Sequence, residues 1–271
     1  MTVGLTRRMT VAFSIVACGA LVRLPPAHAR GRYAVETRQT ISIRGHEQVL
    51  HLYGTRGGTP VIVSSGDGGW IHLGPHVAEL LSANGFFVVG FDAKAYLESF
   101  TSGGTALRAQ DEPGDYKAII DFAAEPTSRK PILIGVSEGA GLSVLAATDP
   151  RIKEAVAGVI GLGLSDLTEL GWRWRDMVIY VTHGAPHEPT FSVKAVVDRV
   201  APIPLAAIHS TRDEFVPVEE LQQVFERAAQ PKRLWIITAS NHRFSDNLAG
   251  FDRALLEAIS WIGAARSGGL K

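Results

Sequence analysis

Residues 131–141 read PILIGVSEGAG, an apolar run that ends in the sequence GVSEG at 135–139. The run is too short to form a helix of its own, so it is typical of a buried strand, and the small residues at 139–147 suit a helix packed closely against a sheet. A serine between two glycines at this junction has two explanations. Ser137 lies either in a tight turn that excludes larger side chains or in a strained turn that exposes a nucleophilic Oγ.

Apolar runs alternate with stretches of helical spacing along most of the chain. An antiparallel hairpin is predicted at 40–43 and 48–53, followed by strands at 61–63, 86–91, 132–136, 156–160, 204–208 and 234–237. Helices are predicted at 76–84, 116–124, 139–147, 218–229 and 248–262. Strands that are apolar on both faces and alternate with helices indicate a parallel sheet covered on both sides. We therefore expect one α/β domain over 36–265, with a mostly parallel central sheet, an antiparallel N-terminal hairpin and helices on both faces.

Residues 165–200 interrupt this alternation. The segment is rich in aromatic residues, contains two prolines near its middle, and is too long for a simple connection between two elements. Two interpretations remain open at this point. The segment forms a small cap over the site, or it forms an extra helix and loop packed on the edge of the sheet.

Two later strands are each followed by a polar loop that carries a partner for a catalytic serine. A serine hydroxyl is a poor nucleophile at neutral pH, so it requires a base within hydrogen-bond reach. Asp213 follows the strand 204–208 and precedes Val-Pro and a helix, and His242 follows the strand 234–237. The order serine, acid, histidine behind successive strands is that of the α/β-hydrolase fold. This order favours Ser137 as the nucleophile over a simple turn residue. It likewise favours His242 as the base over a surface histidine, and Asp213 as the acid over a residue that only starts a helix.

Other residues compete for these roles. Glu214 is next to the candidate acid, and we interpret it as a solvated neighbour. His209 is a rival base, but it ends the strand that carries the acid and does not follow the last strand. His183 and His187 lie in the candidate cap, where substrate contact or plain exposure is expected. No pair of histidines or carboxylates in the sequence has a metal-ligand spacing that competes with this arrangement, so we expect no metal and no cofactor.

The oxyanion of a tetrahedral intermediate requires two backbone N–H donors. We expect one from Glu138, the residue after the nucleophile, and one from the loop SGDGGW at 65–70, where Asp67 is the expected donor and Gly68 the alternative. Glycines in this loop allow the backbone to approach a substrate closely. The loop and the aromatic segment also provide candidate substrate contacts, namely Gly68, Trp70, Trp172 and Trp174.

Two carboxyl groups in this arrangement are unusual. Asp67 and Glu138 would place negative charge beside an oxyanion, which disfavours it unless the side chains point away or meet a cation. A cationic or amine-bearing substrate would supply that cation. The simpler alternative is that Glu138 bonds locally to polar groups or water.

Charge and hydropathy argue against several other classes of protein. Lys+Arg and Asp+Glu are equal at 27 each, so no net field attracts nucleic acid or an anionic membrane. After the N-terminal segment, no apolar run approaches the roughly 20 residues that a membrane span needs. The expected partner is therefore a small molecule or a lipid, and no nucleic acid.

Residues 1–29 have the pattern of an export signal. The arginines at 7–8 precede an apolar stretch at 9–22, and residues 25–29 end in an A-x-A-like cleavage site. We expect a periplasmic or secreted protein exported by a Sec signal. Two alternatives are a weak twin-arginine signal and a lipobox-like sequence that would make Cys18, the single cysteine of the chain, a lipidated N-terminus.

Two motifs resemble a particular bacterial family. Residues 63–70, VSSGDGGW, look like the Ser-Gly-Asp-Gly-Gly-Trp signature of the VirJ/AcvB virulence-protein family, and residues 89–97, VGFDAKAYL, are similar to its G-x-D-x-x-x-Y-F/W stretch. Residues 135–139 depart from the pattern, because that family more often has Gly-Tyr-Ser-Phe-Gly. The resemblance implies an α/β-hydrolase fold over about 40–262, export to the periplasm and hydrolysis of aminoacylated phospholipids.

The residues and the resemblance together predict an exported serine hydrolase that cleaves a small-molecule or lipid ester through an acyl-enzyme. A lipid substrate would bring the protein to a membrane surface. Two alternatives remain open, a catalytically silent binding protein on the same scaffold and a peptidase or acyltransferase with the same triad.

Overall fold

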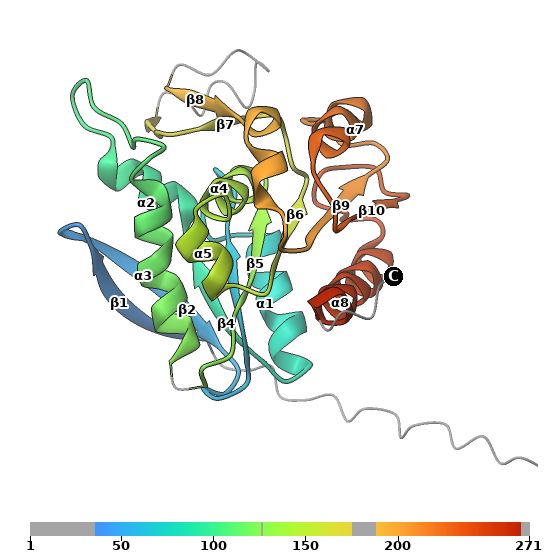
Figure 1. Ribbon diagram of the computed structural model, residues 1–271, viewed down its shortest axis with the longest axis horizontal. Helices are drawn as coiled ribbons and strands as arrows, with labels where there is room; N and C mark the ends of the chain where they lie inside the picture. The colour runs from blue at the N-terminus through green and yellow to red at the C-terminus, as the bar shows by residue number, and fades with distance from the viewer. Residues whose placement is uncertain (1–35, 126, 175–187, 267–271) are drawn as a thin grey trace, which may run out of the picture. The chain divides into compact units, whose positions relative to one another are not determined.

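Eight strands form one sheet in the part of the chain that the structure describes, residues 36–125, 127–174 and 188–266 (Figure 1). The structure is a computed structural model. In the order in which they pair, the strands are β1 (Thr37–Ile43), β2 (His46–Tyr53), β4 (Phe86–Phe91), β3 (Thr59–Ser64), β5 (Ile132–Val136), β6 (Gly158–Leu162), β9 (Leu205–Ser210) and β10 (Lys232–Ile237).

The pairing confirms the predicted mixture of parallel and antiparallel strands. β1 and β2 form the antiparallel hairpin, β2 is antiparallel to β4, and every pair from β4 to β10 is parallel. The carboxyl ends of β3, β5, β6, β9 and β10 therefore meet at one edge of the sheet. Ligand sites of open parallel sheets lie at this edge.

Helices cover both faces of the sheet, and the side chains of each central strand alternate between the two layers. Ile132, Ile134 and Val136 of β5 pack in one cluster with α1 (Leu73–Ala83) and α8 (Leu248–Arg266). Leu133 faces the opposite cluster. That cluster contains residues of α2 (Ala93–Phe100), α3 (Glu112–Ala124), α4 (Glu138–Ala146), α5 (Pro150–Ala155) and α7 (Val218–Arg227).

The structure contains two short helices that the sequence analysis did not predict, α2 and α5. α2 has only eight residues, too few for a clear apolar period, and it begins at a local signal: the Asp92 carboxylate accepts a hydrogen bond from the N–H of Ala95 at 3.0 Å. α5 has six residues and begins in the same way after Asp149. Short elements such as these are specified by caps and packing more than by periodicity.

The ends of the candidate cap form a second, two-stranded sheet. β7 (Leu167–Glu169) pairs antiparallel with β8 (Thr190–Ser192), and two short 3₁₀ turns, Val193–Ala195 and Val197–Val200, follow. Residues 175–187, which include both candidate cap histidines, lie outside the described residues, as do 1–29. The cap at 165–200 and the division into a signal and a domain at 36–265 stay predictions.

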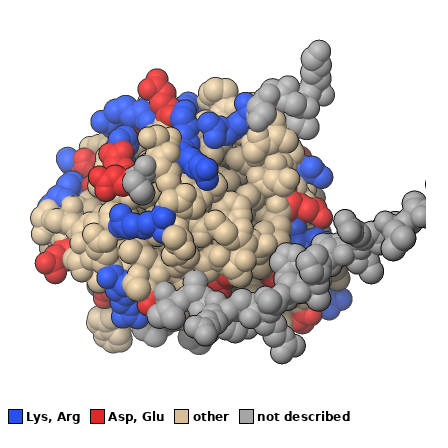
Figure 2. Space-filling model, turned by 90° about the horizontal axis from the view of Figure 1, so that it is seen from below, with Lys and Arg blue, Asp and Glu red and all other residues tan. Residues whose placement is uncertain are grey.

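The surface carries charges of both signs. Figure 2 shows Lys and Arg side chains interspersed with Asp and Glu on the visible face. None of the helices within 36–266, apart from the stretches that are not described, is long and apolar enough to cross a membrane.

A buried carboxyl group at the start of α3 links stability to pH. Glu112 is fully buried, and neither carboxyl oxygen has a hydrogen-bond partner among the described residues. Burial, reinforced by the charge of Asp115, raises the pKa of Glu112 well above its usual value. Asp115 itself is held by the Arg44 guanidinium and the Tyr96 hydroxyl, at 2.6 Å from each.

We expect Glu112→Gln to make stability less dependent on pH. The folded state holds the Glu112 proton more tightly than the unfolded chain does. The resulting contribution to the free energy of unfolding is full below about pH 4.5 and is lost as pH rises through the raised pKa, by up to about 1.4 kcal/mol per pH unit. Glutamine cannot titrate. Urea unfolding at pH 5 and pH 8 should therefore show a smaller loss for Glu112→Gln than for the wild type. Glu226 is exposed, so Glu226→Gln should lose as much stability between pH 5 and pH 8 as the wild type. A loss of this size in Glu112→Gln would contradict the raised pKa of Glu112.

Candidate active site

Ser137 occupies a strained turn between β5 and α4. Its φ is 51° and its ψ is −116°, in a region that costs a non-glycine residue about 1–3 kcal/mol. Its N–H donates a hydrogen bond to the Leu162 carbonyl oxygen at 2.8 Å. A Cβ at Gly139 would lie 2.6 Å from the Ser64 carbonyl oxygen, so α4 reaches the sheet only because this position lacks a side chain. The two explanations of the motif are therefore compatible, because tight packing holds the serine in the exposed turn.

Asp213 and His242 form a close pair behind two different strands. Asp213 follows β9, and its Oδ2 lies 2.6 Å from the His242 Nδ1. The N–H groups of Phe215 and Val216 donate to the other carboxylate oxygen, each at 2.9 Å. Burial alone would raise the pKa of Asp213, but the hydrogen bond and charge of His242, together with these two donors, hold it below its usual value.

The loop that carries His242 is held from several sides. The Glu214 carboxylate accepts a hydrogen bond from the N–H of His242 at 2.7 Å, so this residue braces the loop and is more than a solvated neighbour. Phe244 is buried and stacks on Phe251 of α8, with ring centroids 4.8 Å apart. Because these contacts join residues far apart in sequence, no motif could have predicted them.

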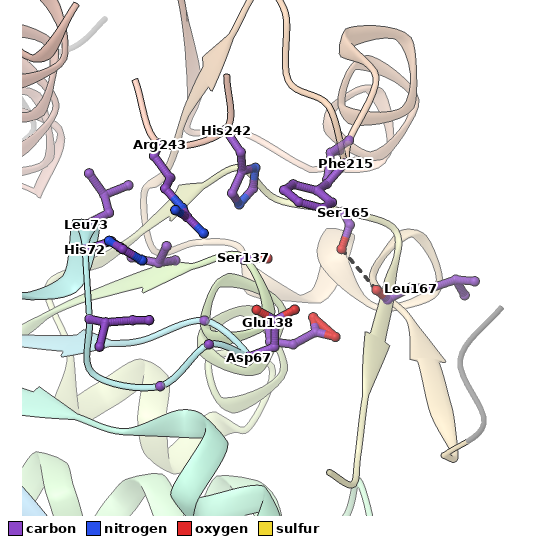
Figure 3. A pocket seen from close by; sticks show the side chains of 16 residues that line it. Asp67, His72, Leu73, Ser137, Glu138, Ser165, Leu167, Phe215, His242 and Arg243 are labelled. Carbon is purple, nitrogen blue, oxygen red and sulfur yellow. Dashed lines mark hydrogen bonds between the residues drawn. The ribbon is translucent and has the colours of Figure 1, made fainter. Parts of the chain in front are cut away.

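Ser137 and His242 line the same pocket, which has a volume of about 330 Å³ (Figure 3). The pocket opens at the carboxyl edge of the sheet, and Asp213, which is not part of its lining, contacts His242 there. No direct hydrogen bond joins Ser137 to His242 in the described part of the chain. Catalytic hydrogen bonds of this kind often tighten only when a substrate is bound.

The loop after β3 lies directly beside Ser137. It closes into a turn through a hydrogen bond from the N–H of Gly69 to the Gly66 carbonyl oxygen at 3.0 Å. A Cβ at Gly66 would lie 3.2 Å from the Ser137 Cβ, so a larger residue there would crowd Ser137. Asp67 and Gly68 follow in this turn and line the pocket, as does Glu138 at the start of α4. Both expected oxyanion donors therefore border the serine.

The Glu138 carboxyl group is buried and bonded locally. The N–H of Glu169 donates to its Oε1 at 3.2 Å. Burial, followed by the charges of Asp67 and Glu169, raises the pKa of Glu138 well above its usual value. A protonated Glu138 adds no full negative charge beside an oxyanion, and this geometry favours the simpler of the two explanations for the carboxyl pair.

His209 holds the loop that carries Asp213. It is fully buried, and its Nε2 donates to the Val216 carbonyl oxygen at 2.9 Å. Burial lowers the pKa of His209. The residue does not line the pocket, which favours His242 over His209 as the base.

The three candidate tryptophan contacts lie outside the lining of this pocket, in contrast to Gly68. Trp70 packs behind the loop, where it stacks on His51 at 4.8 Å and its Nε1 donates to the Tyr53 hydroxyl at 3.3 Å. Trp172 is buried with the Lys94 ammonium 3.9 Å from its ring centroid, and Trp174 is 76% exposed. Packing against the domain accounts for two of these residues, and their role as substrate contacts stays a prediction.

We expect Gly163→Ala to displace His242. Gly163 has a φ of 62°, and a Cβ there would lie 2.8 Å from Nδ1 and 3.1 Å from Nε2 of the imidazole. Because the ring must move, kcat/KM for a p-nitrophenyl ester should fall about 100-fold. Gly45→Ala is the matched control, since Gly45 also has a positive φ but open space around it. Equal activity of the two variants would contradict the placement of His242.

Comparisons with known proteins identify the family and the fold of the chain. The family described as bacterial virulence protein (VirJ) matches residues 59–260. The chain belongs to the VirJ family. A search of curated protein sequences found no match for this VirJ-family chain.

Solved structures with a similar fold include several hydrolases. An esterase from Pyrococcus furiosus has a TM-score of 0.61 at 17% identity, covering 84% of the VirJ-family chain and 91% of the esterase. The α/β hydrolase GrgF from a Penicillium species has a TM-score of 0.59 at 15% identity, covering 83% and 98%. A membrane phospholipase A, described as a bacterial virulence factor, has a TM-score of 0.59 at 13% identity, covering 84% and 86%. The fold is therefore that of the α/β hydrolases.

Proposed function

We propose that the protein is an exported serine hydrolase that cleaves carboxylic esters through an acyl-enzyme. The observation that carries the proposal is the 2.6 Å contact between Asp213 and His242, at the pocket that Ser137 also lines. Membership of the VirJ family and the α/β-hydrolase fold support an ester-hydrolase-like protein.

In the proposed reaction, the Ser137 Oγ attacks the ester carbonyl carbon while the His242 Nε2 takes the hydroxyl proton. Asp213 accepts the hydrogen bond from Nδ1 and stabilises the imidazolium. The N–H groups of Asp67 and Glu138 hold the oxyanion of the tetrahedral intermediate. His242 then gives its proton to the leaving alcohol, and water attacks the acyl-enzyme by the same steps in reverse order.

The pocket lining supports a substrate with an apolar part. Side chains of Ile71, Val136, Leu167, Phe215 and Val216 line it, and three of them are also large exposed hydrophobics, namely Ile71, Leu167 and Phe215. Apolar pockets with a few convergent polar groups are typical of small-molecule sites. We propose a small-molecule or lipid ester as the substrate, the latter presented at a membrane surface, and a periplasmic or secreted location directed by the export pattern of 1–29.

A second candidate is an aminoacyl ester of a phospholipid. The observation that favours it is the position of Asp67, which lines the same pocket as Ser137 and lies near Glu138, where a substrate amine could pair with its carboxylate (Figure 3). The VirJ/AcvB resemblance in the loop at 63–70 points to the same chemistry. A third candidate, a catalytically silent binding protein, is disfavoured because its function would not require the buried Asp213–His242 contact.

A substrate panel tests the proposal. We expect the wild type to hydrolyse p-nitrophenyl butyrate, with much slower turnover of the matched p-nitroanilide and little transfer of the acyl group to added methanol. Alanyl- and lysyl-phosphatidylglycerol, compared with diacyl-phosphatidylglycerol, test the second candidate. Preferred anilide hydrolysis would indicate a peptidase, preferred transfer an acyltransferase, and no turnover of any ester a binding protein.

A further inference from the structure

A second hollow adjoins the active-site pocket and shares one wall with it. The two hollows have His72, Leu73, Phe215 and Arg243 in common. Beyond this shared wall, the second hollow is lined by polar side chains: His76, Glu214, Asn241 and Ser245, with Leu248 as its apolar member. A substrate held at Ser137 could therefore extend past Arg243 into a polar compartment.

Arg243 is the one lysine or arginine among the described residues that line either hollow. It follows His242 directly in the chain, and its guanidinium is exposed and forms no ion pair with any described residue. Its backbone N–H is fixed by the Asn241 Oδ1 at 3.1 Å, which anchors the start of the side chain. A guanidinium without an ion-pair partner among the described residues can donate two parallel hydrogen bonds to a carboxylate or a phosphate.

The other ionisable groups that line the two hollows are histidines and carboxyl groups, so Arg243 is the available permanent positive charge. His76 contacts Asp252 at 2.7 Å, and one oxygen of the Glu214 carboxylate, which keeps its negative charge, accepts the N–H of His242. Figure 3 shows His72 next to Arg243, on the opposite side of Ser137 from Asp67 and Glu138. The second hollow therefore carries one guanidinium, Arg243, and one carboxylate, Glu214, whereas Asp67 and Glu138 lie on the other side of Ser137.

His72 reaches this position through an unusual backbone conformation. Its φ is 56° and its ψ is −111°, a combination that is uncommon for a residue with a side chain, and it directly precedes α1. Strain of this kind is concentrated at functional sites. The conformation places the imidazole in the wall that both hollows share.

We propose that the second hollow binds an anionic group of the substrate, a carboxylate or a phosphate, and that Arg243 pairs with it. The inference rests on the proposed ester hydrolysis and narrows its substrate class to esters that carry such a group. Arg243 is then a specificity residue, because it touches a part of the substrate away from the bond that breaks. His72 adds a second nitrogen donor beside the same group.

Two matched pairs of esters test the proposal and locate the anion. On the acyl side, p-nitrophenyl valerate is compared with the mono-p-nitrophenyl ester of glutaric acid, which adds a carboxylate. On the alcohol side, glycerol monobutyrate is compared with the butyryl ester of glycerol 3-phosphate. We expect the wild type to prefer the anionic member of at least one pair by about tenfold in kcat/KM, mainly through KM.

Variants identify the residue responsible. Arg243→Gln should lower the anionic-to-neutral ratio about tenfold, and Arg243→Lys should retain most of it. Arg253→Gln is the matched control, because Arg253 is an exposed arginine of α8 that lines neither hollow. A ratio that survives Arg243→Gln, or that falls equally in Arg253→Gln, would overturn the proposal. So would the absence of an anionic preference in both pairs.

A binding measurement separates this proposal from the proposed function. Inorganic phosphate and glutarate are titrated into the Ser137→Ala protein by calorimetry, with and without Arg243→Gln. Binding that weakens at least tenfold on loss of Arg243 supports the anion site even if no ester is turned over, in which case only the proposed hydrolysis fails. Turnover of both members of each pair at equal rates, without phosphate or glutarate binding, removes the anion site and leaves the hydrolase.

Discussion

Replacing Ser137 by alanine should lower kcat for p-nitrophenyl butyrate by about 10⁴- to 10⁶-fold, because the remaining pocket has no nucleophile to form an acyl-enzyme. The fold should survive. Alanine retains the Cβ, and the N–H contact to Leu162 does not depend on the hydroxyl. Urea unfolding should therefore give a free energy of unfolding within about 1 kcal/mol of the wild type.

The matched control is Ser143→Ala, which removes a buried hydroxyl from α4, the helix that follows Ser137, without touching the pocket. Its kcat should stay within about threefold of the wild type. Turnover by the Ser137→Ala protein at the rate of this control would end the assignment of the nucleophile. Loss of activity in both variants would point instead to a general sensitivity of α4.

Asp213→Asn should be the second most damaging change, with kcat lowered by about 10³- to 10⁴-fold. The reason lies in how Asp213 is held. Two backbone N–H groups donate to its Oδ1, so the amide oxygen of asparagine should keep that position and turn its NH₂ towards the imidazole. The His242 Nδ1 must then accept a hydrogen bond, and the proton moves to Nε2, where it blocks the uptake of the serine proton.

Two measurements separate this tautomer effect from simple loss of structure. The far-downfield proton resonance expected for Nδ1–H between His242 and Asp213 should be present in the wild type and absent in Asp213→Asn. Glu214→Gln, which alters only the brace on the loop backbone, should keep the resonance and lose no more than about tenfold in kcat. A wild-type rate in Asp213→Asn would show that the carboxylate does not orient the base.

Much of the fold and the candidate site could be predicted because both depend on local patterns. The strand before Ser137 and the strand at 86–91 have the bounds that their apolar runs predicted. Asp213 and His242 were found from their order behind later strands, since parallel strands bring their carboxyl ends to one edge. The pairing at 2.6 Å then follows from the topology.

What the sequence could not reveal depends on contacts between distant segments. The brace from Glu214 to His242 spans 28 positions and needs the final loop geometry. Trp172 was expected at the substrate because it lies in the aromatic segment that could form a cap. Its indole is instead explained equally well by burial and by the Lys94 ammonium over its ring. The second hollow beside Arg243 is lined by residues of α1, of the loop that carries Asp213 and of the loop that carries His242, so no single stretch of sequence could predict it.

The most direct test of the central claim is the mapping of a fluorophosphonate adduct by mass spectrometry on the wild-type protein. The account predicts one adduct, located on Ser137, which forms far more slowly in Asp213→Asn and not at all in Ser137→Ala. A folded wild-type protein that hydrolyses esters but carries the adduct on another residue, or carries none, would contradict the assignment of Ser137 as the activated nucleophile.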